Sequence, residues 1–323
     1  MLKKNILIIC LAFAFLFSCK IKQPTHEFTL SEYPENGITP GSIKIADNIY
    51  IDLAETSNSG YLEFLYYTRR VIGEEEYKSI MPDTDSWRAL IGYKGAYAMS
   101  EYYLRHPAYR NYPVIGISYQ QALKFCKWRA DRVMEFILIQ NNIIPYNISP
   151  PKDSVFTIKK YFSGNYYNIK PSPYIKYYPV YNLPDSAIFM KALKVSDSLY
   201  SKNAKYYKSA KHKDALEVRC LETIPNRCDT LPYGLDPTKN NPDKIYEKRK
   251  LIVDLLGNVR ELTSDSTKAF GGSFFDSCII VNSKYFYPAY PKITQTNKGA
   301  YLNPKGISLL TGFRCVCSWK KWE

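Results

Sequence analysis

The feature that most constrains the fold is a long amphipathic segment that begins at Ser118. Ser118 and Gln121, three residues apart, form a capping box, in which each side chain satisfies a backbone N–H at the start of a helix. Apolar residues then recur on one face at helical spacing: Ala122, Phe125, Cys126, Val133, Phe136 and Ile137. We predict a core-packed helix here, preceded by a short strand at 114–117, with Cys126 as a small core residue rather than a nucleophile.

Shorter patterns flank this helix. Residues 43–45 and 49–53 alternate like strands. Thr56 is placed to cap a helix whose apolar positions recur with helical spacing: Leu62, Leu65 and Tyr66. Trp87 is the predicted core anchor of a mixed, Tyr-rich stretch.

The N-terminal residues resemble a targeting signal rather than part of the folded domain. Lys3 and Lys4 precede an apolar run, residues 6–17, that is too short to span a bilayer comfortably. The run ends in Leu-Phe-Ser-Cys at Cys19, which resembles the lipobox of bacterial lipoproteins. We therefore expect a signal peptide over 1–18, lipidation of Cys19, a Pro- and Gly-rich tether over 19–42, and the periplasmic face of the outer membrane. The alternative is an ordinary secretory signal with a chance Cys.

Residues 150–215 have a different composition from the rest. They hold twelve Lys and ten Tyr against four Asp, an excess of +8, with no Arg. We predict an insertion, about 141–248, that is extended at first and helical through about 186–212. The segment 152–213 is the expected surface for an acidic envelope protein; the alternative is a solvated insertion whose Tyr rings pack on the domain beneath. An exported protein seldom meets nucleic acid, so we expect no such partner.

Export would make disulfides permissible. Besides Cys19, the chain beyond the signal peptide has six cysteines: Cys126, Cys220, Cys228, Cys278, Cys315 and Cys317. Six cysteines allow fifteen full pairings. Cys220 and Cys228 flank a short Pro-containing loop and are the best single candidate pair. The three His of the chain are scattered, which argues against a His-ligated metal centre.

The C-terminal third contains three short blocks: Gly257–Thr263, Gly271–Phe274 and Gly312–Arg314. With residues 49–56 and 113–118 upstream, they resemble, in order, the blocks of the formylglycine-generating, sulfatase-modifying factor family. The resemblance covers roughly residues 43–140 and 250–317. It implies one domain over 43–323 with an α+β fold related to C-type lectins, poor in regular secondary structure. Residues 126–133 further resemble a branch found among gliding-motility and type IX secretion lipoproteins.

The enzymes of this family resemble copper oxidases that use two cysteine thiolates, because thiolates bind the soft Cu(I) ion. The family places both between the Gly-Gly-Ser and Gly-Phe-Arg blocks, where this chain has only Cys278. The iron-dependent branch needs three His ligands. We therefore expect neither copper nor iron and assign no catalytic residue. Arg260 and Leu262 replace the two Trp of the family's Gly-Asn-Val-Trp-Glu-Trp block.

The resemblance also implies a structural calcium ion. Its ligands would be the Asp254 side chain, the carbonyls of Gly257 and Val259, and Glu261, a set of hard oxygen donors that suits Ca²⁺. The alternative is a pair of acids without metal, with Glu261 bonded to Arg260 or Arg314.

The sequence therefore predicts a lipid-anchored, non-catalytic envelope protein that serves as a structural or assembly component of a gliding-motility or type IX secretion type machinery. Two alternatives remain open. One is an oxidase of the formylglycine-generating type with a non-standard site. The other is a glycan- or peptidoglycan-binding module that uses exposed Tyr rings as sugar platforms.

Overall fold

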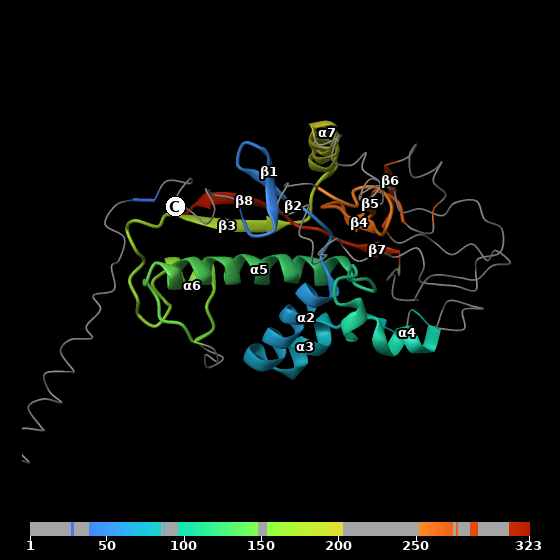
Figure 1. The fold of residues 1–323 in the computed structure, drawn as a ribbon. Coiled ribbons are helices and arrows are strands. Elements are labelled where there is room, and N and C mark those ends of the chain that lie inside the picture. Colours follow the sequence, from blue (N-terminus) through green and yellow to red (C-terminus); the bar gives the residue numbers. More distant parts are fainter. Residues whose placement is uncertain are drawn as a thin grey trace, which may run out of the picture.

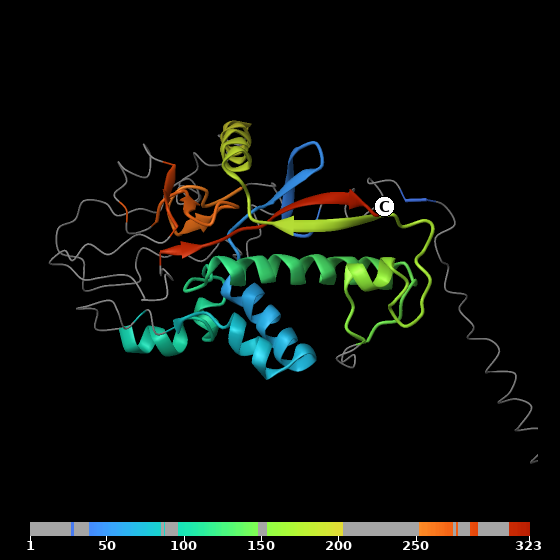
Figure 2. The ribbon, with the colours of Figure 1, turned by 180° about the vertical axis from the view of Figure 1, so that it is seen from behind.

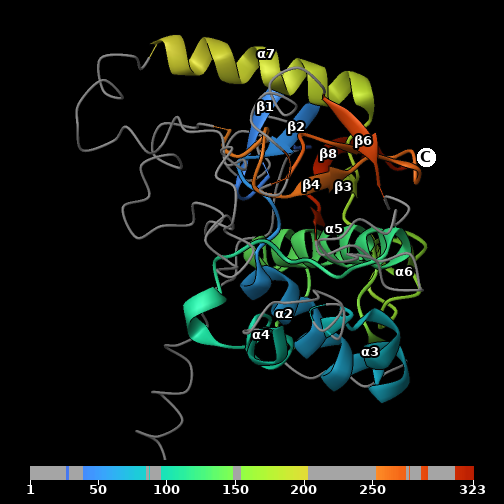
Figure 3. The same ribbon diagram turned by 90° about the vertical axis from the view of Figure 1, so that its right-hand side faces the viewer.

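The computed structural model describes residues 27–28, 39–84, 87, 96–147, 154–202, 252–273, 276, 285–289 and 310–323. In this part of the chain, two four-stranded sheets lie between layers of helices (Figure 1). Helix α7 covers one side of the sheets, and α5 covers the other, with α2 and α3 beyond it (Figure 3). The expected α+β class is confirmed.

The first sheet joins segments that are far apart in the sequence. Its strands, in spatial order, are β1 (Ser42–Ala46), β2 (Ile49–Asp52), β8 (Val316–Lys321) and β3 (Tyr177–Asn182). All three pairings are antiparallel. The predicted strands at 43–45 and 49–53 are therefore confirmed as β1 and β2, and the C-terminal strand holds them to the middle of the chain.

The second sheet carries the C-terminal sequence blocks. Its strands, in spatial order, are β6 (Phe286–Pro288), β5 (Lys268–Phe270), β4 (Arg260–Leu262) and β7 (Thr311–Gly312). The β4–β7 pairing is parallel, and the other two are antiparallel. Parallel pairing places the Gly-Asn-Val block beside the Gly-Phe-Arg block, so Glu261 lies in register with Gly312.

Helix α5 (Tyr119–Gln140) confirms the predicted capping box, since the Ser118 and Gln121 side chains both make the expected hydrogen bonds. Ala122, Cys126, Ala130 and Met134 follow one another on its buried face. Phe136 was predicted on this face, but it is 53% exposed. The reason is geometric: two residues beyond Met134 lie about 200° around the helix.

Two expectations near α2 (Asn58–Tyr67) were wrong in detail. The N-cap is Ser57, whose side chain accepts a hydrogen bond from the Gly60 N–H. Thr56 lies one residue too early, because its backbone is extended and bonds to Phe313 and Val114. Tyr66 is 74% exposed rather than buried.

The other described helices are short, apart from α7: η2 (Thr68–Ile72), α3 (Glu74–Ile80), α4 (Ala96–Tyr102), η4 (Pro107–Tyr109), α6 (Ile158–Phe162) and α7 (Ser186–Lys202). The strand predicted at 114–117 is not formed; this buried stretch is irregular, and only Pro113 makes a bridge, with Ser57. Trp87 is buried against Tyr103, which confirms it as a core anchor.

The described part of the Lys- and Tyr-rich segment, residues 154–202, is built into the domain. Strand β3 pairs with β8 from Tyr177 to Asn182, and α7 crosses the opposite side of the sheet from α5 (Figure 2). Tyr161, Tyr166 and Tyr181 are buried. The predicted helix is confirmed over Ser186–Lys202, whereas the stretch before it contains the short helix α6 as well as extended chain. The Tyr rings named here pack on the domain. Residues 150–153 and 203–215 of the segment lie outside the described residues.

Candidate functional site

The predicted calcium ligands surround a buried ion pair. Asp254 and Gly257 lie in the loop before β4, Val259 directly precedes that strand, and Glu261 lies within it. Arg314, from the Gly-Phe-Arg block, extends toward the same point. Glu261 and Arg314 are both fully buried, at 0% exposure.

Arg314 holds Glu261 through two hydrogen bonds. Its Nε and Nη2 donate to Oε2 and Oε1 of Glu261, each at 2.6 Å. The same guanidinium donates to the carbonyl oxygens of Asp52, Val253 and Asp254. A buried charge is tolerated when it is paired and its remaining hydrogen-bonding positions are filled. Arg314 meets that condition and ties three separate segments together.

This geometry bears on the calcium hypothesis. Both Glu261 oxygens already accept a hydrogen bond from Arg314, so a metal ion at Glu261 would share this carboxylate with the guanidinium. The arrangement fits the alternative in which Glu261 pairs with Arg314. Thermal melting in calcium and in chelator distinguishes the calcium site from this alternative.

A second buried carboxylate, Glu55, lies beside this pair. Its Oε2 accepts a hydrogen bond from Asn258 Nδ2 at 2.6 Å, and its Oε1 accepts one from the Val259 N–H at 3.3 Å. Burial, with the nearby Asp254 and Glu261 carboxylates, raises the pKa of Glu55 well above its ordinary value of 4.5. Burial raises the pKa of Glu261 to about 7, and Arg314 opposes that shift.

The block glycines are required by close backbone approach. A Cβ at Gly271, where φ is +92°, would lie 2.4 Å from the Leu255 carbonyl oxygen. One at Gly312 would lie 2.8 Å from the Val114 carbonyl oxygen and 2.9 Å from a Val259 methyl group. Glycine is the residue that fits such contacts. At these two positions the blocks therefore serve packing.

Asp276, three residues after Ser273, bonds to the Gly-Gly-Ser block and to β4. Its Oδ2 accepts from the Ser273 N–H at 2.8 Å, from Ser273 Oγ at 2.7 Å and from Arg260 Nε at 3.1 Å. Its Oδ1 accepts from Arg260 Nη2 at 2.7 Å. Arg260, which stands where the family has Trp, also lies over the Tyr287 ring at 4.8 Å. Asp276 was not predicted from the sequence; its position three residues after Ser273 was the available signal.

The described cysteines lie in the hydrophobic core. Cys126 Sγ on α5 is 3.6 Å from Cys315 Sγ, and Cys317 is buried on β8. The hydrogen bond with Cys315, together with burial, raises the pKa of the Cys126 thiol well above its ordinary value. A raised pKa keeps the thiol protonated, which disfavours nucleophilic chemistry. The prediction that Cys126 is a core residue is confirmed.

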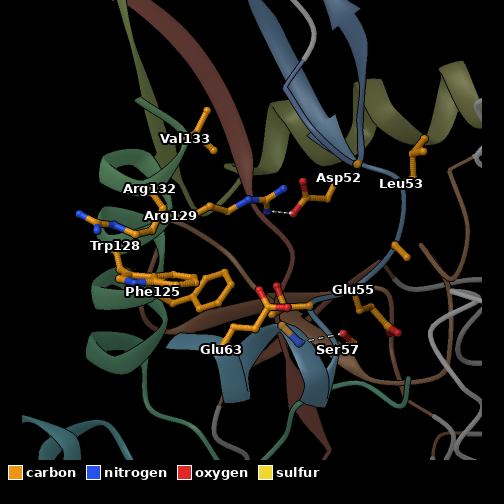
Figure 4. A pocket seen from close by; sticks show the side chains of 14 residues that line it. Asp52, Leu53, Glu55, Ser57, Glu63, Phe125, Trp128, Arg129, Arg132 and Val133 are labelled. Atoms are coloured by element: carbon orange, nitrogen blue, oxygen red, sulfur yellow. Dashed lines mark hydrogen bonds and ion pairs between the residues drawn. The ribbon is translucent and has the colours of Figure 1, made fainter. Parts of the chain in front are cut away.

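A cleft of about 330 Å³ opens between α5 and the segment that joins β2 to α2 (Figure 4). Asp52 and Arg129 face one another across one end, and Glu63 rises from α2 at the other (Figure 4). Phe125 and Trp128 form the wall between them. The sequence analysis assigned no role to Glu63 or Arg129, because the cleft exists only once α5 packs beside residues 52–63.

Four predicted or discussed residues lie outside the described residues: Cys19, Cys220, Cys228 and Cys278. Lipidation of Cys19 and the Cys220–Cys228 pairing therefore stay predictions. None of the helices in the described ranges is both long enough and apolar enough to cross a membrane.

The Gly-Asn-Val, Gly-Gly-Ser and Gly-Phe-Arg blocks lie together in and beside the second sheet, in the order expected for a sulfatase-modifying factor fold. A family model described as "Sulfatase-modifying factor enzyme 1-like domain" matches residues 26–319, so the chain belongs to this family. The fold expected from the sequence blocks is thereby confirmed. A search of curated proteins and a search of solved structures each found no significant match.

Proposed function

We propose that this chain is a non-catalytic member of its family: a lipid-anchored envelope protein that serves as a structural or assembly component of a gliding-motility or type IX secretion type machinery. Its expected location is the periplasmic face of the outer membrane, anchored through Cys19. The branch is supported by the resemblance of residues 126–133, and the anchor by the residues around Cys19.

The observation that carries the non-catalytic assignment is the Arg260–Asp276 ion pair. The family enzymes need two thiolates between the Gly-Gly-Ser and Gly-Phe-Arg blocks, and this chain has only Cys278 there. Asp276 instead bonds to Ser273 and to Arg260. Arg260, which replaces a family Trp in the Gly-Asn-Val block, thus pairs with Asp276, which follows the Gly-Gly-Ser block. Such an ion pair links Asp276 to β4 and supplies no soft ligand for copper.

Envelope proteins are the proposed partners, reached in part through the basic side chains of 152–213. In the described portion, Lys191 and Lys194 are exposed on α7, on the side of the sheet away from α5. Exposed Lys side chains can steer an acidic partner and make the association sensitive to salt.

Co-purification from native membranes tests this proposal. Tagged wild-type protein should retain envelope proteins at low salt, and Lys191→Glu/Lys194→Glu should lose those that bind α7. Lys78→Glu, an exposed Lys on α3, is the matched control. Deletion of 152–213 is unsuitable because it would remove β3. Recovery of no envelope protein with the wild type would contradict the assembly role.

The anchor has a separate test. Cys19→Ala should release the protein from membranes, because lipid chains on Cys19 would supply most of the membrane affinity. A Cys19→Ala variant that stays membrane-bound would contradict lipidation as the anchor.

A further inference from the structure

In the cleft between α5 and residues 52–63, the two arginines have ion-pair partners, but one accessible acidic side chain has none among the described residues. Arg129 Nη1 donates to Asp52 Oδ2 at 2.6 Å, and Arg132 Nη1 donates to Glu135 Oε2 at 2.7 Å. Each guanidinium also lies over a Tyr ring, that of Tyr181 or of Tyr67. Both cations of the cleft wall are therefore already neutralised.

Glu63 is the charge left over. It is exposed at the cleft mouth, and within the described ranges it makes neither a hydrogen bond nor an ion pair. Glu55, the other acid that lines the cleft, is fully buried and bonded to Asn258. Glu63 therefore places a carboxylate without a described ion-pair partner at the mouth of the cleft, where it can pair with a cationic ligand.

Two buried oxygen atoms of the cleft lining also lack partners. Asp52 is 6% exposed and Thr56 is 9% exposed, yet Asp52 Oδ1 and Thr56 Oγ1 have no hydrogen-bond partner among the described residues. Two buried donors of the lining, Trp128 Nε1 and Arg132 Nε, also have no hydrogen-bond partner among the described residues. Unsatisfied buried polar groups are uncommon in folded proteins and call for an explanation. A ligand that carries both donors and acceptors, such as a side chain with its peptide backbone, would supply one.

The remaining wall is apolar. Phe125, half-buried Trp128 and half-buried Val133 line it. An indole ring attracts a cation placed over its face, and apolar side chains accommodate an alkyl stem. A carboxylate at the mouth and an aromatic and aliphatic wall together match a positively charged group carried on a hydrocarbon chain.

We propose that this cleft binds a basic side chain, Lys or Arg, from a partner polypeptide. Its cationic head would pair with Glu63, and its stem would lie along Trp128 and Val133. That the ligand belongs to a polypeptide rests on the proposed assembly function. The cationic chemistry rests on the cleft itself.

Binding of short peptides to the full-length protein in detergent tests this proposal, with saturation-transfer NMR as the readout. Acetyl-Gly-Lys-Gly-amide should bind, and the same peptide with Nε-acetyl-lysine should bind at least tenfold more weakly, because it keeps the stem and loses the charge. A neutral methyl pyranoside serves as the competing ligand class. Equal binding of both peptides, or binding of the sugar alone, would overturn the proposal.

Glu63→Gln should weaken binding of the Lys peptide at least tenfold while keeping the wild-type melting temperature. Glu75→Gln, an exposed acid on α3, should leave binding unchanged. Unchanged binding in Glu63→Gln would overturn the assignment of that residue. The two proposals can be contradicted separately. Recovery of envelope partners without peptide binding would contradict the cleft proposal and leave the assembly role standing. Peptide binding without envelope partners would contradict the assembly role and leave the cationic binding of the cleft standing.

Discussion

At the centre of the family blocks, Glu261 and Arg314 are paired with each other, whereas in the cleft beside α5 the charged side chains are only partly paired among the described residues. Around Glu261 and Arg314, a fully buried carboxylate and guanidinium bond to each other and to backbone carbonyls. In the cleft, two guanidiniums are paired but Glu63 is left over at the mouth. The first region uses its polar groups to hold three chain segments together, and the second leaves chemistry open to a ligand. In this family member, the described motif residues hold the fold together, and the proposed binding site is the cleft beside α5.

The largest expected effect follows from breaking the buried ion pair. Arg314→Met should lower the free energy of unfolding by about 3–5 kcal/mol, because it leaves the Glu261 charge buried without a partner. Urea denaturation measures the loss. The double variant Glu261→Gln/Arg314→Met should lose less than the sum of the two single variants. A loss below about 1 kcal/mol in Arg314→Met would show that the pair does not hold the core.

Removal of Asp276 should have the next largest effect. Asp276→Ala removes the acceptor of four hydrogen bonds, two of them from Arg260, so we expect a loss of about 2–3 kcal/mol. Asp47→Ala, in an exposed pair with Lys44, should cost no more than about 0.5 kcal/mol. Equal losses in the two variants would contradict the structural role of the Arg260–Asp276 pair.

The helix and strand patterns predicted much of this architecture because they are local. The capping box at Ser118 and the alternation in β1 and β2 need only neighbouring residues. Strand β3 could be predicted as extended but not as part of the sheet, since its partner β8 lies about 140 residues further along the chain. Phe136 was misplaced because strict helical geometry takes it off the buried face.

The sites were less predictable for the same reason. The pairing of Glu261 with Arg314 could be stated only as one alternative, because nothing local decides between a metal ion and a guanidinium. The cleft was not predicted, since Glu63 and Trp128 come together only when α2 packs beside α5. Asp276 could not be assigned a role from its neighbours alone, because its ion-pair partner, Arg260, lies earlier in the chain on β4.

The buried acids beside the family blocks should also make stability depend on pH, with a smaller effect. Folded Glu55 keeps its proton at pH values where an unfolded Glu, near 4.5, has lost it. The unfolded state then binds fewer protons, so stability should fall as pH rises above about 4.5. Glu261, with a pKa of about 7, acts in the same direction. Urea denaturation at pH 5 and pH 8 measures the slope, which Glu55→Gln should reduce. A slope unchanged by Glu55→Gln, or stability rising with pH, would contradict this account.

The smallest expected effect is that of calcium. Because Arg314 already neutralises the Glu261 carboxylate, we expect melting curves in calcium and in chelator to coincide. A ligand that binds only the folded state would instead raise the melting temperature with its concentration. A calcium-dependent rise in melting temperature that is lost in Asp254→Ala would contradict this expectation. It would support Asp254, Gly257, Val259 and Glu261 as calcium ligands.

The central claim is that the family blocks build structure here and do not form an oxidase centre. The most direct measurement is mass spectrometry of a Cys-containing sulfatase peptide incubated with the purified protein, copper and oxygen. An active formylglycine-generating enzyme assayed in parallel serves as the positive control. The account predicts that the peptide Cys stays unconverted with this protein. Formation of formylglycine above the level of a protein-free control would contradict it.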